Sequence, residues 1–263
     1  MNKLEQKLKE IKKSKKLGLM THVIVGYPSL KGTVELIKLM EKSGVDIIEL
    51  QIPFSDPLAD GPTIMKACEE SIRSGTKVKN AFDIAKKLSD TVQIPLIFMA
   101  YYNTVFQYGV AKFCSDSKKT GIVGLIVPDM PLEEEGNEHF FKECKKNNLY
   151  AIRVIAPATT DERLKKNAKY ASGFVYCSAR QGTTGARNTL DPKLALYLGK
   201  VRKTFNCPIA VGFGISKKEH MVTIKKYADI AVIGSAIINI IDNNPKTYLQ
   251  IVQKFLKEVM PSN

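Results

Sequence analysis

Three acidic side chains, Glu49, Asp56 and Asp60, stand in the segment ELQIPFSDPLADGP, which covers residues 49–62. Glu49 lies near the end of an apolar run, and Asp60 follows on a loop whose backbone is restricted by three prolines. Burial favours the protonated form of a carboxylate, and two acids that face one substrate can divide general-acid and general-base work. The segment predicts acid–base chemistry. Other interpretations stay open: Glu49 could pair with a neighbouring lysine or arginine or reach solvent at the strand end, and Asp60 could be a turn or cap residue.

Glycine recurs in three loops later in the chain, SARQGTTGAR, GFGIS and IGSAI. Glycine lets backbone N–H groups approach an anion closely, and a helix N-terminus adds the positive end of its dipole. In the last loop, Gly234 and Ser235 are expected to open a short helix. Any one of these glycines could belong to an ordinary turn, but three such loops in succession predict a phosphate-binding site.

Short apolar runs rich in β-branched residues provide the strands that would position these groups. They cover residues 19–25, 45–50, 94–100, 123–127, 150–155, 173–177, 208–212 and 230–234. Most are continuously apolar, as parallel strands covered on both sides should be. Eight strand–helix repeats predict the α/β class and a (β/α)8 TIM barrel. An open doubly wound sheet is the alternative, but the GxGxxG turn expected after its first strand is absent.

Helix signals separate these runs, and both candidate sites fall at predicted strand ends, where TIM barrels carry their chemistry. The positions that can cap, open or end helices are Ser29, Gly44, Pro62, Gly75, Thr160 or Asp161, and Ser216. Residues 2–16 form a predicted amphipathic helix in front of the barrel. No Ser/Gly/Pro-rich linker divides the chain, so we expect residues 1–263 to form a single TIM-barrel domain.

Composition excludes several other classes. The chain is 44% hydrophobic and 25% charged, and no run approaches the ~18 apolar residues that a membrane span needs. The basic N-terminal segment is not followed by the apolar region of a signal peptide. The net charge of +14 is spread over most predicted helices without a nucleic-acid-binding module. The five cysteines have no CxxC spacing. We expect a cytoplasmic protein with reduced thiols and no metal, which binds neither nucleic acid nor membrane.

Six motifs occur in the order and spacing of one family: ELQIPFSDPLADGPTI, YYNTVF, VPDMP, GTTGA, GFGIS and GSAI. From about Leu17 to its end, the chain resembles the tryptophan synthase alpha subunit family. The resemblance implies a TIM-barrel lyase that cleaves indole-3-glycerol phosphate by a retro-aldol reaction to indole and glyceraldehyde 3-phosphate. It implies no cofactor in this chain and a beta-subunit partner, a pyridoxal-phosphate enzyme, that receives the indole in an α2β2 complex.

The resemblance also implies a role for individual residues. Glu49 would be the main proton-transfer group, Asp60 would interact with the indole N–H, and Tyr176 would lie near Glu49. The remaining positions are phosphate-binding Gly185, Gly214, Gly234 and Ser235, the closing-loop Thr184 that would order Asp60, and His22, Tyr101 and Phe213 in the indole pocket.

Three positions depart from the family pattern. Gln51 stands where glycine is usual, and its side chain could hydrogen-bond Glu49 or narrow the pocket. His22 replaces an aromatic or hydrophobic residue, and we expect it to form a local hydrogen bond. Tyr27 replaces an acid in the turn after the first strand. These changes bear on rate and on coupling to the partner more than on the reaction.

Three competing functions remain at this point. Another phosphate-binding barrel enzyme would use a catalytic lysine or an aspartate at other strand ends, and strand-end lysines are missing here. A barrel kept mainly to activate its partner would not need Glu49, Asp60 and Tyr176. A stand-alone lyase that releases free indole is compatible with the same residues.

Overall fold

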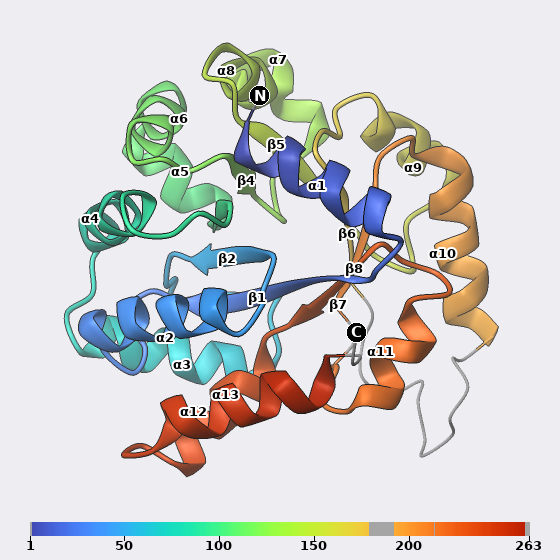
Figure 1. Ribbon diagram of the computed structural model, residues 1–263. Helices are drawn as coiled ribbons and strands as arrows, with labels where there is room; N and C mark the ends of the chain where they lie inside the picture. Colours follow the sequence, from blue (N-terminus) through green and yellow to red (C-terminus); the bar gives the residue numbers. More distant parts are fainter. Residues whose placement is uncertain (1, 179–191, 213, 261–263) are drawn as a thin grey trace.

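A closed barrel of eight parallel strands forms the centre of the computed structural model, which describes residues 2–178, 192–212 and 214–260 (Figure 1). Each strand pairs with the next along the chain, and the last pairs with the first. The strands are β1 (Gly18–Ile24), β2 (Ile47–Gln51), β3 (Leu96–Met99), β4 (Gly124–Ile126), β5 (Tyr150–Ile155), β6 (Val175–Ser178), β7 (Ile209–Gly212) and β8 (Ile230–Ile233). Each overlaps a predicted run, and the predicted TIM barrel is confirmed.

Helices surround this barrel (Figure 1). They are α1 (Lys3–Ser14), α2 (Leu30–Lys42), α3 (Pro62–Arg73), α4 (Val78–Ser89), α5 (Tyr102–Tyr108), α6 (Val110–Lys119), η1 (Leu132–Glu134), α7 (Glu135–Glu138), α8 (Phe140–Lys146), α9 (Asp161–Ala168), α10 (Pro192–Thr204), α11 (Lys218–Ile224), α12 (Ser235–Asn243) and α13 (Tyr248–Val259). Within the described ranges, no helix combines the length and apolar character that crossing a bilayer requires.

Most of the predicted helix boundaries are confirmed. The Ser29 side chain accepts a hydrogen bond from the Gly32 N–H at the start of α2, and Thr160 caps α9 in the same way. Gly44, just after α2, has φ +89°, a left-handed conformation that favours glycine. The prediction for Ser216 is wrong, because α11 begins two residues later. The Ser216 N–H instead donates to His220 Nδ1 in that helix.

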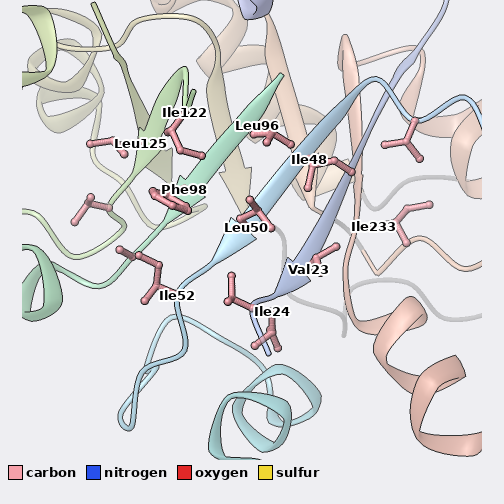
Figure 2. Packing of buried hydrophobic residues seen from close by; sticks show 14 of the residues in the cluster. Val23, Ile24, Ile48, Leu50, Ile52, Leu96, Phe98, Ile122, Leu125 and Ile233 are labelled. Atoms are coloured by element: carbon pink, nitrogen blue, oxygen red, sulfur yellow. The ribbon is translucent and has the colours of Figure 1, made fainter. Parts of the chain in front are cut away.

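A large apolar core lies between the strands and the surrounding helices. Val23, Leu50 and Phe98 extend from the outer faces of three consecutive strands and are at most 3% exposed (Figure 2). This layer fixes the strands against the helices. The register that it holds places His22 of β1 directly beside Glu49 of β2.

A second apolar cluster fills the inside of the barrel. Ile47, Ile97 and Ile152 point inward from their strands, and Leu4 and Ile11 of α1 close the amino-terminal end. The opposite end, where the carboxyl ends of the strands lie, is called the barrel mouth below. His22, Glu49 and Gln51 are buried polar side chains at this end.

Candidate active site

Glu49 is buried at the barrel mouth, near the end of β2. Its Oε1 lies 3.3 Å from His22 Nδ1, and the two side chains are only 4% and 7% exposed. The other oxygen, Oε2, is buried and has no hydrogen-bond partner among the described residues. Neither alternative offered for Glu49 is observed: its carboxylate is buried, and no described lysine or arginine pairs with it. Its neighbour is His22, for which a local hydrogen bond was expected.

Asp60 reaches the same mouth from the loop between β2 and α3. Its Oδ2 accepts hydrogen bonds from Gln51 Nε2 at 2.7 Å and from the Tyr101 hydroxyl at 2.9 Å. The Tyr101 oxygen in turn accepts a hydrogen bond from the Ala59 N–H at 3.0 Å. The hydrogen bonds of this carboxylate thus run to the barrel wall and not to its own turn. Gln51 bonds Asp60 instead of Glu49, because its side chain stands beyond Glu49 on the strand, nearer the loop.

An aromatic pair stands beside these acids. The rings of Phe54 and Tyr101 stack with centroids 5.2 Å apart and an interplanar angle of 19°. Tyr101 thus lies at the mouth, as its predicted place in an indole pocket requires. Phe54 was not predicted, although its position on the loop that carries Asp60 was a usable signal. Phe213 lies outside the described residues.

Burial and charge change the protonation behaviour of this cluster. Burial raises the pKa of the Asp60 carboxyl above its usual range, against the opposing effects of His22, Gln51 and Tyr101. Burial lowers the pKa of His22, but Glu49, Asp60 and Gln51 together outweigh this effect, so the net change in the pKa is upward. Both net shifts favour the protonated form, of Asp60 and of His22, and so reduce the total negative charge in the site.

Tyr176 is directed into the barrel from β6. Burial, followed by the nearby charges of Glu49 and Asp60, raises the pKa of its hydroxyl well above the usual range. The phenol is therefore protonated at neutral pH and can donate a hydrogen bond. A β-carbon at Gly212 of β7 would lie 2.6 Å from this hydroxyl oxygen, so only glycine leaves room for the ring. The sequence motif GFGIS gave no indication of this steric role.

The predicted phosphate end lies beside the acidic end at the mouth. Gly234 precedes α12, which begins at Ser235, and a β-carbon at Gly234 would lie 3.2 Å from His22 Cβ. Gly214 has φ +63°, which favours glycine. The Tyr27 hydroxyl donates to Asp242 of α12 and connects that helix to the turn after β1. The predicted residues Thr184 and Gly185 lie outside the described residues.

Comparison with known proteins agrees with this geometry. The sequence model of the family described as tryptophan synthase alpha chain matches residues 8–262. A tryptophan synthase alpha chain from Desulfotalea psychrophila is 47% identical over 241 residues, which is 92% of this chain and 94% of the relative. Another from Petrotoga mobilis is 41% identical over 256 residues, covering 96% and 98%. The chain belongs to the tryptophan synthase alpha chain family.

Solved structures of this family have the same architecture. A chain of M. tuberculosis tryptophan synthase superimposes with a TM-score of 0.88 at 27% identity, covering 98% of this chain and 97% of the other. A chain of the tryptophan synthase α2β2 complex from Pyrococcus furiosus gives 0.86 at 32% identity, covering 92% and 97%. The resemblance stated from the motifs is therefore confirmed, and the chain is an enzyme of tryptophan biosynthesis, a carbon–carbon lyase.

Proposed function

We propose that Glu49 is the main proton-transfer group in the lyase reaction of this chain, the retro-aldol cleavage of indole-3-glycerol phosphate. The observation that carries the proposal is the state of its carboxylate. It is buried at the barrel mouth, with Oε1 beside His22 and Oε2 without a partner among the described residues. A buried oxygen with no partner is costly, and a substrate group that exchanges a proton with it would satisfy it.

The reaction needs two proton transfers near one another. Indole C3 gains a proton, and the C3′ hydroxyl of the glycerol chain loses one. The C3–C3′ bond then breaks, its electron pair stays with the indole ring, and the hydroxyl carbon becomes the aldehyde of glyceraldehyde 3-phosphate. Glu49 can donate the first proton as an acid and accept the second as a carboxylate, so one side chain can serve both steps.

Asp60 is assigned to the indole nitrogen. Protonation at C3 places positive charge on that nitrogen, and an ionised carboxylate beside the N–H stabilises it. The bonds from Gln51 and Tyr101 hold the carboxylate in place before substrate arrives. We assign Tyr176 as a neutral hydrogen-bond donor near Glu49, and His22 and Tyr101 to the wall of the indole pocket.

The phosphate group is assigned to Gly214, Gly234 and Ser235. The first N–H groups of α12 have no acceptor within the helix, and the positive end of the helix dipole points to the same place. Gly185 and Thr184 stay predictions for phosphate binding and for loop closure, and Phe213 stays a prediction for the indole pocket. This assignment orients the substrate across the mouth, with its phosphate by β8 and its indole by β2 and β3.

The proposed chemistry uses only protein side chains. No group of three or more His, Cys, Asp or Glu side chains in the described part of the chain is arranged to hold a metal ion. The absence of a metal and of an organic cofactor stays a prediction. Pyridoxal phosphate is expected only on the beta subunit.

A beta subunit is the proposed partner, in an α2β2 complex such as that of the Pyrococcus furiosus relative. Two large apolar side chains are exposed on segments that follow mouth strands. Leu58, between β2 and α3, is 87% exposed, and Phe106 on α5 is 50% exposed. A partner that covers them would lie next to the mouth, where indole is released. We further propose a cytoplasmic location and one functional domain across residues 1–263.

The deciding experiment measures indole release from indole-3-glycerol phosphate by the purified chain, alone and with added beta subunit. We expect release in both cases, and faster release with the partner. Glu49→Gln keeps the shape of the side chain and should reduce kcat by at least ~10³-fold. Glu69→Gln, on the exposed side of α3, is the matched control and should behave like the wild type. Normal turnover by Glu49→Gln contradicts the assignment. If the chain alone releases indole as fast as it does with added beta subunit, it is a stand-alone lyase.

A further inference from the structure

In its described part, the barrel mouth contains the buried carboxylate of Glu49, the half-buried carboxylate of Asp60 and little positive charge. Among the described residues, the only basic side chain within ion-pair distance of Glu49 or Asp60 is His22. The whole chain carries forty lysines and arginines, yet the ion pairs these form in the described part lie away from this cluster. Among the described residues, the positive charge that can balance these carboxylates therefore comes from one histidine.

The ring is placed by the barrel itself. His22 and Glu49 are directly paired across β1 and β2, and Gly234, just after β8, packs against the other side of His22. A β-carbon at Gly234 would come within 3.2 Å of His22 Cβ, so the backbone on this side also lies against the His22 side chain. A surface ion pair between long side chains lacks this constraint.

The two nitrogens of the ring have different surroundings. Nδ1 faces Glu49 Oε1, whereas Nε2 is buried with no hydrogen-bond partner in the described part of the chain. Gln51 Oε1 is likewise buried and unpartnered, and the Gln51 side chain lies close enough to raise the pKa of His22. A protonated ring has a donor on each nitrogen, so it can serve Glu49 on one side and the Gln51 carbonyl on the other.

We propose that His22 is a positioning residue for the reaction proposed above. Its protonated ring holds Oε1 of Glu49 and leaves Oε2 as the oxygen that exchanges protons with the substrate. Gln51 also donates to Asp60. A hydrogen bond from His22 Nε2 to Gln51 Oε1 would therefore join both acids through the ring and the amide, in the order Glu49–His22–Gln51–Asp60.

The proposal accounts for the charges that face the ring. Among the described residues, Glu49 on β2 and Asp60 on the following loop are the titratable groups whose charges act on it. Tyr176 on β6 faces the same two acids, and Gly234, just after β8, contributes only backbone. The two carboxylates oppose each other's ionisation in a site of low dielectric constant, and an imidazolium beside them offsets this repulsion. As the pH rises through the pKa of His22, this compensation is lost.

A pair of substitutions separates positioning from packing. His22→Phe keeps a ring but removes the donor, and kcat should fall at least ~10-fold with KM changed by less than about threefold. His22→Asn places an uncharged amide donor near the position of Nδ1 and should restore most of kcat. It should also remove the contribution of His22 to the alkaline side of the kcat–pH profile. Wild-type kcat in His22→Phe, or an Asn variant as slow as the Phe variant, would overturn the proposal.

A second measurement needs no turnover. The chain has three histidines, so the imidazole signals can be followed by NMR against pH, with His22 identified from its absence in His22→Asn. In Glu49→Gln the His22 midpoint should move to lower pH, because the attracting charge is gone. His139 and His220 provide reference signals in each sample. An unmoved His22 midpoint refutes the coupling. If the wild type releases no indole, the proposed function fails, but the NMR titration still shows whether His22 and Glu49 are coupled.

Discussion

The two ends of the barrel are buried to a similar degree but are built from opposite kinds of side chain. At the amino-terminal end, Leu4 and Ile11 of α1 pack on Ile47 inside the barrel, and all three are at most 8% exposed. At the mouth, Glu49 and Gln51 follow Ile47 on the same face of β2, and they are only 3% and 0% exposed. A single strand thus passes from an apolar seal to a polar site within five residues.

The difference shows where the molecule gains stability and where it gives some up. Each buried apolar side chain contributes roughly 1.5–3 kcal/mol to folding. A buried polar atom without a partner costs about 1–3 kcal/mol. Three such atoms belong to side chains in the described part of the mouth: His22 Nε2, Glu49 Oε2 and Gln51 Oε1. We infer that the apolar end and the outer core stabilise a barrel whose mouth is arranged for substrate.

The sharpest test of this contrast is at the mouth. Asp60→Asn should reduce kcat by ~10²- to 10⁴-fold, because the amide cannot stabilise positive charge on the indole nitrogen. The fold should be at least as stable at neutral pH. Burial raises the pKa of Asp60, so its ionised form carries a cost above that pKa, and an amide does not.

The measurements are indole release and urea unfolding of the same preparations. Asp56→Asn, on the same loop but exposed, is the matched control and should leave the rate of the chain without partner nearly unchanged. Since the pKa of Asp60 is raised, wild-type activity should decline as the pH falls through it, from a higher pH than for an exposed aspartate. An Asn variant that loses stability but keeps its rate would reverse the contrast between the two ends.

The opposite outcome is expected at the amino-terminal end. Leu4→Ala should lower the free energy of unfolding by about 2–5 kcal/mol, because it leaves a cavity where α1 seals the barrel. The kcat of the folded enzyme should stay within about twofold of the wild type, since no mouth residue loses a contact. Leu58→Ala, the same change at an 87% exposed leucine of the mouth loop, should alter stability by less than about 0.5 kcal/mol. Equal losses in both variants would contradict the account.

The strands and helices that build the two ends of the barrel could be predicted from the sequence, because they depend on local signals. The predicted run 150–155 coincides with β5, and Gly44 and Pro62 end and open helices where their backbone preferences require. Glu49 and Asp60 could be predicted to lie at the same end of the barrel, since the carboxyl ends of parallel strands meet there. Ser216 shows the limit of such signals: a capping residue type does not cap when the helix begins later.

The pairing of side chains at the mouth could not be read in the same way. From the sequence, Gln51 could hydrogen-bond Glu49 or narrow the pocket. In the structure it donates to Asp60, because the loop brings that carboxylate back over the strand end. The room that Gly212 leaves for Tyr176 depends on two strands side by side. These contacts join residues that are distant in the sequence or on irregular backbone, and neither periodicity nor propensity determines them.

The smallest expected effect concerns the phosphate end and asks whether the mouth binds charge as well as moving protons. Ser235→Asp places a second anion at the start of α12, where it favours the helix but repels a phosphate. We expect KM to rise at least ~10-fold with a smaller change in kcat, because the charge acts on binding before chemistry. Ser235→Ala keeps the backbone N–H and should change KM much less. If both variants keep the wild-type KM, the phosphate lies elsewhere, and the polar mouth serves only the indole end of the substrate.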